Sequence, residues 1–116
     1  MFLLRQPEVR DLRLFTRLPD RFRRSVPSAW GDANRPGQPT DSFLEGPVFD
    51  RHGNLYVTDI PFGRVFRIDP QGEWECVAEW DGEPNGLKFL DDRRLLVADY
   101  RNGLMACDVM TGDVRP

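Results

Sequence analysis

Residues 46–63 read GPVFDRHGNLYVTDIPFG, and residues 86–103 read GLKFLDDRRLLVADYRNG. The second stretch repeats the first forty positions later, so that residues 55–59 (LYVTD) align with residues 95–99 (LLVAD). Similarity at a fixed period of this length is typical of repeat architectures, in which each period is one structural unit. The forty-residue period therefore decides the fold prediction.

Each unit contains four short apolar runs separated by turn residues. In the first unit the runs are residues 48–49, 55–60, 64–68 and 74–80. No stretch of the unit carries a sustained helical period, so we expect four antiparallel strands per unit. Asp69 aligns with Asp108, one position short of the period, which predicts a one-residue insertion in the turn that follows. A four-stranded meander repeated every ~40–45 residues is typical of a β-propeller blade.

We therefore predict an all-β fold with two propeller blades, residues 45–84 and 85–116, after an N-terminal extension over residues 1–44. Propellers close with about four to eight blades. Two blades alone leave sheet faces and edge strands uncovered, which is an aggregation liability. We expect the chain to be a fragment of a larger propeller that self-associates through its exposed blade edges unless another partner covers them.

The N-terminal extension does not fit the repeat. Residues 11–18 alternate apolar and polar side chains in a way that predicts a strand. The alternative is a helix with a basic stripe at Arg10, Arg13, Arg17, Arg21 and Arg24 that could bind an anionic membrane, but Pro7 and Pro19 interrupt it. Residues 25–42 are rich in Pro and Gly, which predicts a loop that wraps over the first blade.

Charge and composition exclude several classes of protein. The formal net charge is -3, and residues 25–116 carry nine basic and sixteen acidic groups, which argues against a nucleic-acid surface. No apolar run approaches the ~20 residues of a membrane span, so we expect a soluble, cytoplasmic protein without a membrane partner. Cys76 and Cys107 are isolated in the sequence and are predicted to be ordinary core thiols.

Four oxygen-bearing side chains are predicted to gather at one end of the blades. Glu45 and Asn85 precede the first strand of each unit, and Asp59 and Asp99 follow the second. Calcium takes six to eight oxygens from carboxylates and amides, so Glu45 is the candidate metal ligand and the other three are candidate channel-lining residues. The alternatives are a solvated Glu45, a turn role for Asn85, and aspartates that cap loops by accepting backbone N–H bonds.

Three segments of the chain resemble one protein family: residues 43–50 (FLEGPVFD), 53–68 (GNLYVTDIPFGRVFRI) and 83–88 (EPNGLK). In order and spacing they are similar to the senescence-marker-protein, gluconolactonase and luciferin-regenerating-enzyme family of six-bladed β-propellers. The likeness extends over about residues 11–116. It implies a hydrolase of sugar lactones that depends on calcium or another divalent metal, held in the central channel.

Carried onto this sequence, the resemblance makes Glu45 the metal ligand of the first blade, while the other ligands and the general base of the family lie in blades that this chain lacks. Glu45 and Asn85 offer at most about three oxygens, fewer than calcium takes. We therefore expect the N-terminal fragment of a gluconolactonase-type lactone hydrolase, inactive alone, with no catalytic residue of its own. The alternative is a non-enzymatic module that binds or assembles through its blades.

Overall fold

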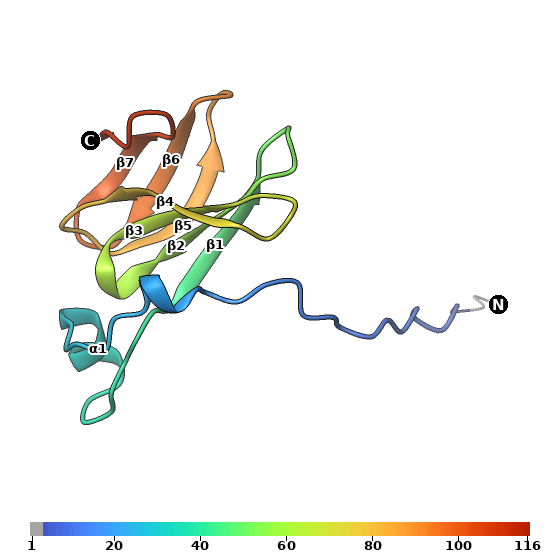
Figure 1. The fold of residues 1–116 in the computed structure, drawn as a ribbon, viewed down its shortest axis with the longest axis horizontal. Coiled ribbons are helices and arrows are strands. Elements are labelled where there is room, and N and C mark those ends of the chain that lie inside the picture. Colours follow the sequence, from blue (N-terminus) through green and yellow to red (C-terminus); the bar gives the residue numbers. More distant parts are fainter. Residues whose placement is uncertain (1–3) are drawn as a thin grey trace.

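The computed structural model of the protein describes residues 4–116. Most of it is two four-stranded antiparallel sheets, each a meander of strands that follow one another in the chain (Figure 1). The first sheet contains β1 (Leu44–Phe49), β2 (Leu55–Asp59), β3 (Arg64–Ile68) and β4 (Trp74–Glu79). The second sheet contains β5 (Pro84–Phe89), β6 (Arg94–Asp99), β7 (Gly103–Asp108) and β8 (Val114–Arg115). The all-β prediction is confirmed, and the assignment of the sheets to a propeller stays a prediction.

The forty-residue period is visible in the strand register. Pairs in the first sheet recur forty positions later in the second: Leu44–Asp59 as Pro84–Asp99, Val48–Tyr56 as Lys88–Leu96, and Phe49–Leu55 as Phe89–Leu95. A bond from Gly72 N–H to Asp69 O closes the turn after β3, whereas the turn after β7 runs from Asp108 to Gly112 and is one residue longer. The predicted turn insertion is therefore confirmed.

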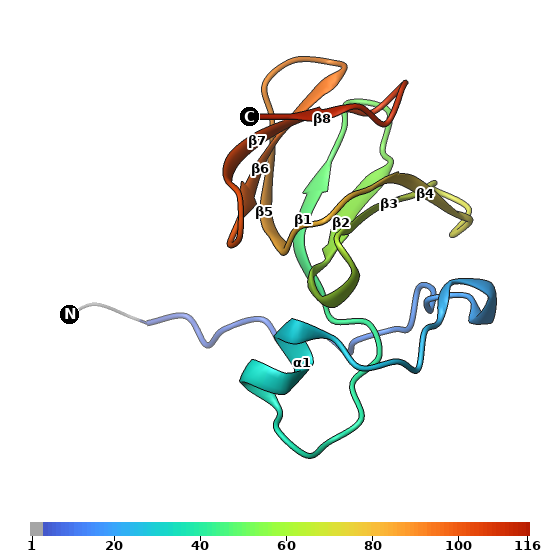
Figure 2. The ribbon, with the colours of Figure 1, turned by 90° about the vertical axis from the view of Figure 1, so that its left-hand side faces the viewer.

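The two sheets pack face to face, with β5 against β1 and β2 (Figure 2). The cluster buried between them, the intersheet core, is formed by Tyr56, Val65, Ala78, Leu95, Val97, Met105 and Cys107. Burial raises the pKa of the Cys107 thiol to about 11, so this cysteine is a core residue as predicted. The alternation of side chains along each strand sends every second residue into this core.

A second apolar cluster lies on the opposite face of the first sheet. This cluster, the outer core, consists of Val57, Phe66, Ile68 and Trp74, and Leu18 and Phe22 pack against it. Residues 16–24, which we call the strap, carry those two side chains and include the short 3-10 helix η1 (Asp20–Phe22). The first sheet is thus covered on both faces, by the second sheet and by the strap.

The prediction of a strand over residues 11–18 is wrong, and so is the helical alternative. The segment adopts no regular structure, the start of the described chain runs away from both sheets (Figure 1), and Leu12 is fully exposed at 101%. A strand needs a partner for its backbone groups, and the strap is held to the first sheet through side chains instead. Thr16 makes such a contact, with its hydroxyl donating to Gly72 O at 3.0 Å.

The predicted loop over residues 25–42 contains a short helix, α1 (Ala29–Asn34), which the sequence analysis missed. Ser28 caps it, because its hydroxyl accepts the Gly31 N–H at 3.0 Å. The helix lies against η2 (Ile60–Phe62), the loop between β2 and β3. None of the described helices is long and apolar enough to cross a membrane.

Candidate functional site

The four predicted site residues lie at one end of the two sheets. Glu45 is the second residue of β1 and Asn85 the second residue of β5, while Asp59 and Asp99 end the neighbouring strands β2 and β6. Because each first strand runs antiparallel to its neighbour, the start of one meets the end of the other. The structure therefore brings the four residues to the same end, as the repeat predicts.

The starts of β1 and β5 touch each other across the two sheets. Gly46 lies so close to the second sheet that a Cβ atom built on it would meet the carbonyl oxygen of Asn85 at 2.1 Å. The same oxygen accepts a hydrogen bond from the Thr58 hydroxyl at 2.9 Å. Glycine is required at position 46 both for this approach and for its positive φ of 58°.

Glu45 directly precedes Gly46, and Asn85 supplies the carbonyl oxygen of this contact, while the side-chain oxygens of both residues stay available. Glu45 is half-buried and Asn85 is exposed. Within residues 4–116 neither side chain forms a hydrogen bond or an ion pair. A carboxylate and an amide carbonyl are both ligands that calcium accepts, so the donor types at this position fit a hard cation.

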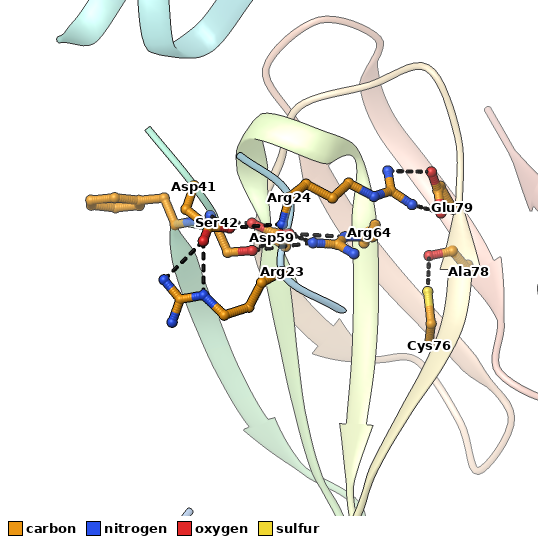
Figure 3. Close-up of polar contacts among 10 residues, drawn as sticks. Arg23, Arg24, Asp41, Ser42, Asp59, Arg64, Cys76, Ala78 and Glu79 are labelled. Atoms are coloured by element: carbon orange, nitrogen blue, oxygen red, sulfur yellow. Dashed lines mark hydrogen bonds and ion pairs between the residues drawn. The ribbon is translucent and has the colours of Figure 1, made fainter. Parts of the chain in front are cut away.

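Asp59 has no such freedom, because every one of its oxygens is used inside the protein. Its side chain is fully buried, and Oδ1 accepts the backbone N–H of Phe43 at 2.9 Å. Oδ2 accepts the Ser42 hydroxyl and the guanidinium of Arg64, which approaches to 2.6 Å (Figure 3). Arg64 itself is 1% exposed and lies between the rings of Phe62 and Phe66. Asp59 thus anchors the start of β1 and neutralises a buried cation.

Asp99 makes the equivalent contact in the second sheet. Its Oδ1 accepts the backbone N–H of Glu83 at 3.0 Å, and Glu83 is forty positions after Phe43. Its Oδ2 accepts the indole N–H of Trp80 at 2.7 Å, whereas the Oδ2 of Asp59 accepts from Arg64. Burial alone would raise the pKa of Asp99, but hydrogen bonds from Glu83, Trp80 and Asn102 outweigh it, so the pKa is lowered.

These contacts favour the capping role of the two aspartates over the channel-lining role. Each carboxylate holds the residue that leads into the first strand of its own sheet. The return bond is also repeated, from Ile60 N–H to Phe43 O and from Tyr100 N–H to Glu83 O. We call this reciprocal pair of backbone contacts and the carboxylate that completes it the aspartate clamp.

Sequence reasoning missed two parts of this end of the molecule. Arg64, five residues after Asp59, was not assigned a role, although an Asp and an Arg on either side of a hairpin loop are a recognisable signal. The helix α1 was missed as well, and it brings Trp30 and Asn34 to an open hollow that Asn85 and Tyr100 also line. Trp30 packs there against Phe43 in a tilted arrangement, with ring centroids 4.8 Å apart.

The candidate metal site is not complete within the described residues. No cluster of three or more His, Cys, Asp or Glu side chains suited to a metal ion occurs among residues 4–116. Glu45 can supply two oxygens and Asn85 one, against the roughly six to eight that calcium takes. The donor types fit a hard cation and their number does not, so any ion bound here needs water or further ligands.

We predict that Asp59→Asn destabilises the protein more than Asp99→Asn. The first substitution leaves the buried Arg64 guanidinium without its anion, which costs about 3–5 kcal/mol of unfolding free energy. The second removes a charge that binds only neutral N–H groups, so we expect a loss of about 1–3 kcal/mol. Urea unfolding followed by tryptophan fluorescence measures both, and equal losses or the reverse order would contradict the assignment.

Asp99 also predicts how stability depends on pH. Because its pKa is lower in the folded state than in the unfolded state, its contribution is full above about pH 4 and disappears as the pH falls through the folded-state pKa. The difference in unfolding free energy between the wild type and Asp99→Asn should therefore shrink as the pH falls below about 4. A difference that stays constant from pH 7 to acid unfolding would show that the carboxylate charge is not involved.

Comparisons with known proteins give no family for the chain. No family model matches the sequence, and no curated protein and no solved structure matches it either. The likeness to the gluconolactonase family therefore rests on residues 43–50, 53–68 and 83–88.

Proposed function

We propose that the chain forms the first two blades of a six-bladed, gluconolactonase-type hydrolase that acts on small sugar lactones. Glu45 is the residue of this chain that binds the divalent cation of that enzyme, with calcium as the expected ion. The family resemblance supplies the reaction, and the forty-residue register of the two sheets supports the blade assignment. The expected location is the cytoplasm. The acidic body of the chain would not favour binding to nucleic acid.

The observation that carries the proposal is the matching position of Glu45 and Asn85 at the starts of β1 and β5. The two residues hold the same position in successive units, and the backbone of Gly46 lies against Asn85. The first strands of propeller blades surround the central channel, so a side chain at the start of each such strand points to one mouth of that channel. Repetition of this position around a ring would bring several oxygens to one axis.

The chain supplies binding rather than chemistry. Asp59 and Asp99 are occupied by the aspartate clamps, so neither carboxylate is available to take a proton from water. Opening a lactone requires a base for the attacking water and a positive group near the ring carbonyl. Glu45 contributes to holding a cation and nothing more, so the isolated chain should bind the ion weakly and should not turn over a lactone.

Calcium binding at Glu45 tests the proposal. We expect that titration of the full chain with calcium chloride to about 10 mM shifts the amide resonances of residues 44–46 and of Asn85 and Gly86, since a partial site binds in the weak, millimolar range. Glu45→Gln should abolish these shifts, because it removes the charged ligand and keeps the size of the side chain. Glucono-δ-lactone should hydrolyse at its spontaneous rate in the presence of the chain.

Glu75→Gln is the matched control, because Glu75 lies on β4 and pairs with Arg67 away from the starts of the first strands. It should leave the calcium-dependent shifts unchanged. Shifts that survive in Glu45→Gln, or that are absent from the wild type, would remove the basis for the metal role. Lactone turnover that Glu45→Gln does not alter would contradict the proposed site even if the chain proved to be an enzyme.

A further inference from the structure

The second sheet has one face that nothing in the described chain covers. Leu95 and Val97 point from β6 into the intersheet core, so Leu96 and Ala98 between them point to the opposite side. The cross-strand partners of these two residues on β7 are Ala106 and Leu104. We call Leu96, Ala98, Leu104 and Ala106 the open face; Leu104 is 62% exposed.

The repeat shows what kind of surface fits the open face. By strand register, Leu96, Ala98 and Leu104 correspond to Tyr56, Thr58 and Val65 of the first sheet. These three are buried to 2%, 0% and 0% exposure. The second sheet covers them with the side of β6 and β7 that carries Leu95, Val97, Met105 and Cys107. In this repeat, the sheet face that carries the equivalents of Leu96, Ala98 and Leu104 therefore packs against the face of another sheet that carries the equivalents of Leu95, Val97 and Met105.

The chain carries a second surface of that opposite type, on the first sheet. The register relates Leu95, Val97, Met105 and Cys107 to Leu55, Val57, Phe66 and Ile68, all of which belong to or pack against the outer core. The outer core is thus the repeat-equivalent of the surface that covers Tyr56 and Val65. In the structure it is closed by the strap rather than by a sheet.

The strap is held by polar contacts and by the packing of Leu18 and Phe22 on the outer core. In its middle, the Arg21 guanidinium donates to Trp74 O at 2.9 Å. At its start, the Thr16 hydroxyl accepts the indole N–H of Trp74 at 2.9 Å. At its end, Arg24 forms a two-pronged ion pair with Glu79 at 2.7 and 2.9 Å (Figure 3). Between them, Phe22 packs on Phe66 with ring centroids 5.0 Å apart. Exposed ion pairs of this kind are weak and sensitive to salt, so the Arg24–Glu79 pair is the contact of the strap that is released most easily.

We propose that the open face docks the outer core of a second copy of this chain whose strap has moved aside. The contact is head-to-tail, between two different surfaces, so each docked copy presents a further open face. The occupant is a second copy of this chain because the two kinds of sheet face that pack together in the intersheet core recur on the chain a second time, as the open face and as the outer core.

The strap is therefore a gate on self-association. While it is closed, a copy can offer its open face but not its outer core, and no chain of contacts can grow. This inference does not depend on lactone chemistry or on calcium, and it concerns the chain by itself, with no third blade on the open face. It accounts for the asymmetry between a first sheet covered on both faces and a second sheet covered on one.

Two variants of the full chain test the gate. Thr16→Val with Arg24→Glu loosens the strap, since it removes the contact to Trp74 and places like charges at Glu79. We expect the wild type to remain monomeric in light scattering at concentrations where the loosened variant forms dimers and larger species. Adding Leu104→Glu to the loosened variant should weaken its association at least about tenfold, because a charge at the centre of an apolar contact is not tolerated.

A mixing experiment separates head-to-tail docking from a symmetric contact. The loosened Leu104→Glu chain can offer only its outer core, and the wild type can offer only its open face, so the mixture should form a one-to-one complex that neither forms alone. Leu90→Glu is the control, because Leu90 is also exposed (51%) and lies in the turn before β6, outside the open face; in the loosened chain it should leave association intact. Circular dichroism checks that each variant is folded. A loosened chain that stays monomeric at about 1 mM, or that associates regardless of Leu104→Glu, would overturn the proposal.

Discussion

The aspartate clamp is the interaction on which the rest of the structure depends. In each sheet one carboxylate at the end of the second strand accepts the backbone N–H of the residue that leads into the first strand, Phe43 for Asp59 and Glu83 for Asp99. The clamp fixes where β1 and β5 begin and so places Glu45 and Asn85 at matching positions. A charged acceptor makes a stronger hydrogen bond than a neutral one, which suits a contact that defines strand register. The aspartates therefore serve the site by positioning it rather than by lining it.

The two clamps share the backbone contact and differ in everything around it. Asp59 neutralises Arg64, a buried cation held between two phenyl rings, whereas Asp99 accepts neutral N–H groups from Trp80 and Asn102. The first sheet is also closed on both faces, and the second sheet is closed on one. The repeat thus provides two equivalent frameworks, and the strap and the Arg64 pair distinguish the first of them from the second. This asymmetry leaves the open face of the second sheet uncovered within the described chain, while the strap closes the outer core of the first.

The sequence predicted the parts of the fold that repeat and failed on the parts that do not. The forty-residue match located both four-stranded sheets, the turn insertion after Asp108 and the common end at which Glu45 and Asn85 lie. Residues 11–18 do not form the predicted strand because side-chain alternation does not by itself satisfy the backbone groups, and this segment pairs with none of the described strands. Helix α1 was hidden by the Pro and Gly residues around it, and its only local signal is the Ser28 cap. The partnership of Asp59 with Arg64 has no counterpart in the second unit, so comparing the units could not reveal it.

Amide hydrogen exchange at Phe43 and Glu83 tests the central claim that each forty-residue unit is held by its own aspartate clamp. Both amides lie just outside the strands that they precede, so they would exchange rapidly if the carboxylates did not bind them. The clamp predicts slow exchange at both, comparable with the amides of β2 and β6. It also predicts that Asp99→Asn weakens the protection of Glu83 while that of Phe43 is retained. Rapid exchange at both amides in the wild type, or loss of protection at both in that single variant, would contradict the claim.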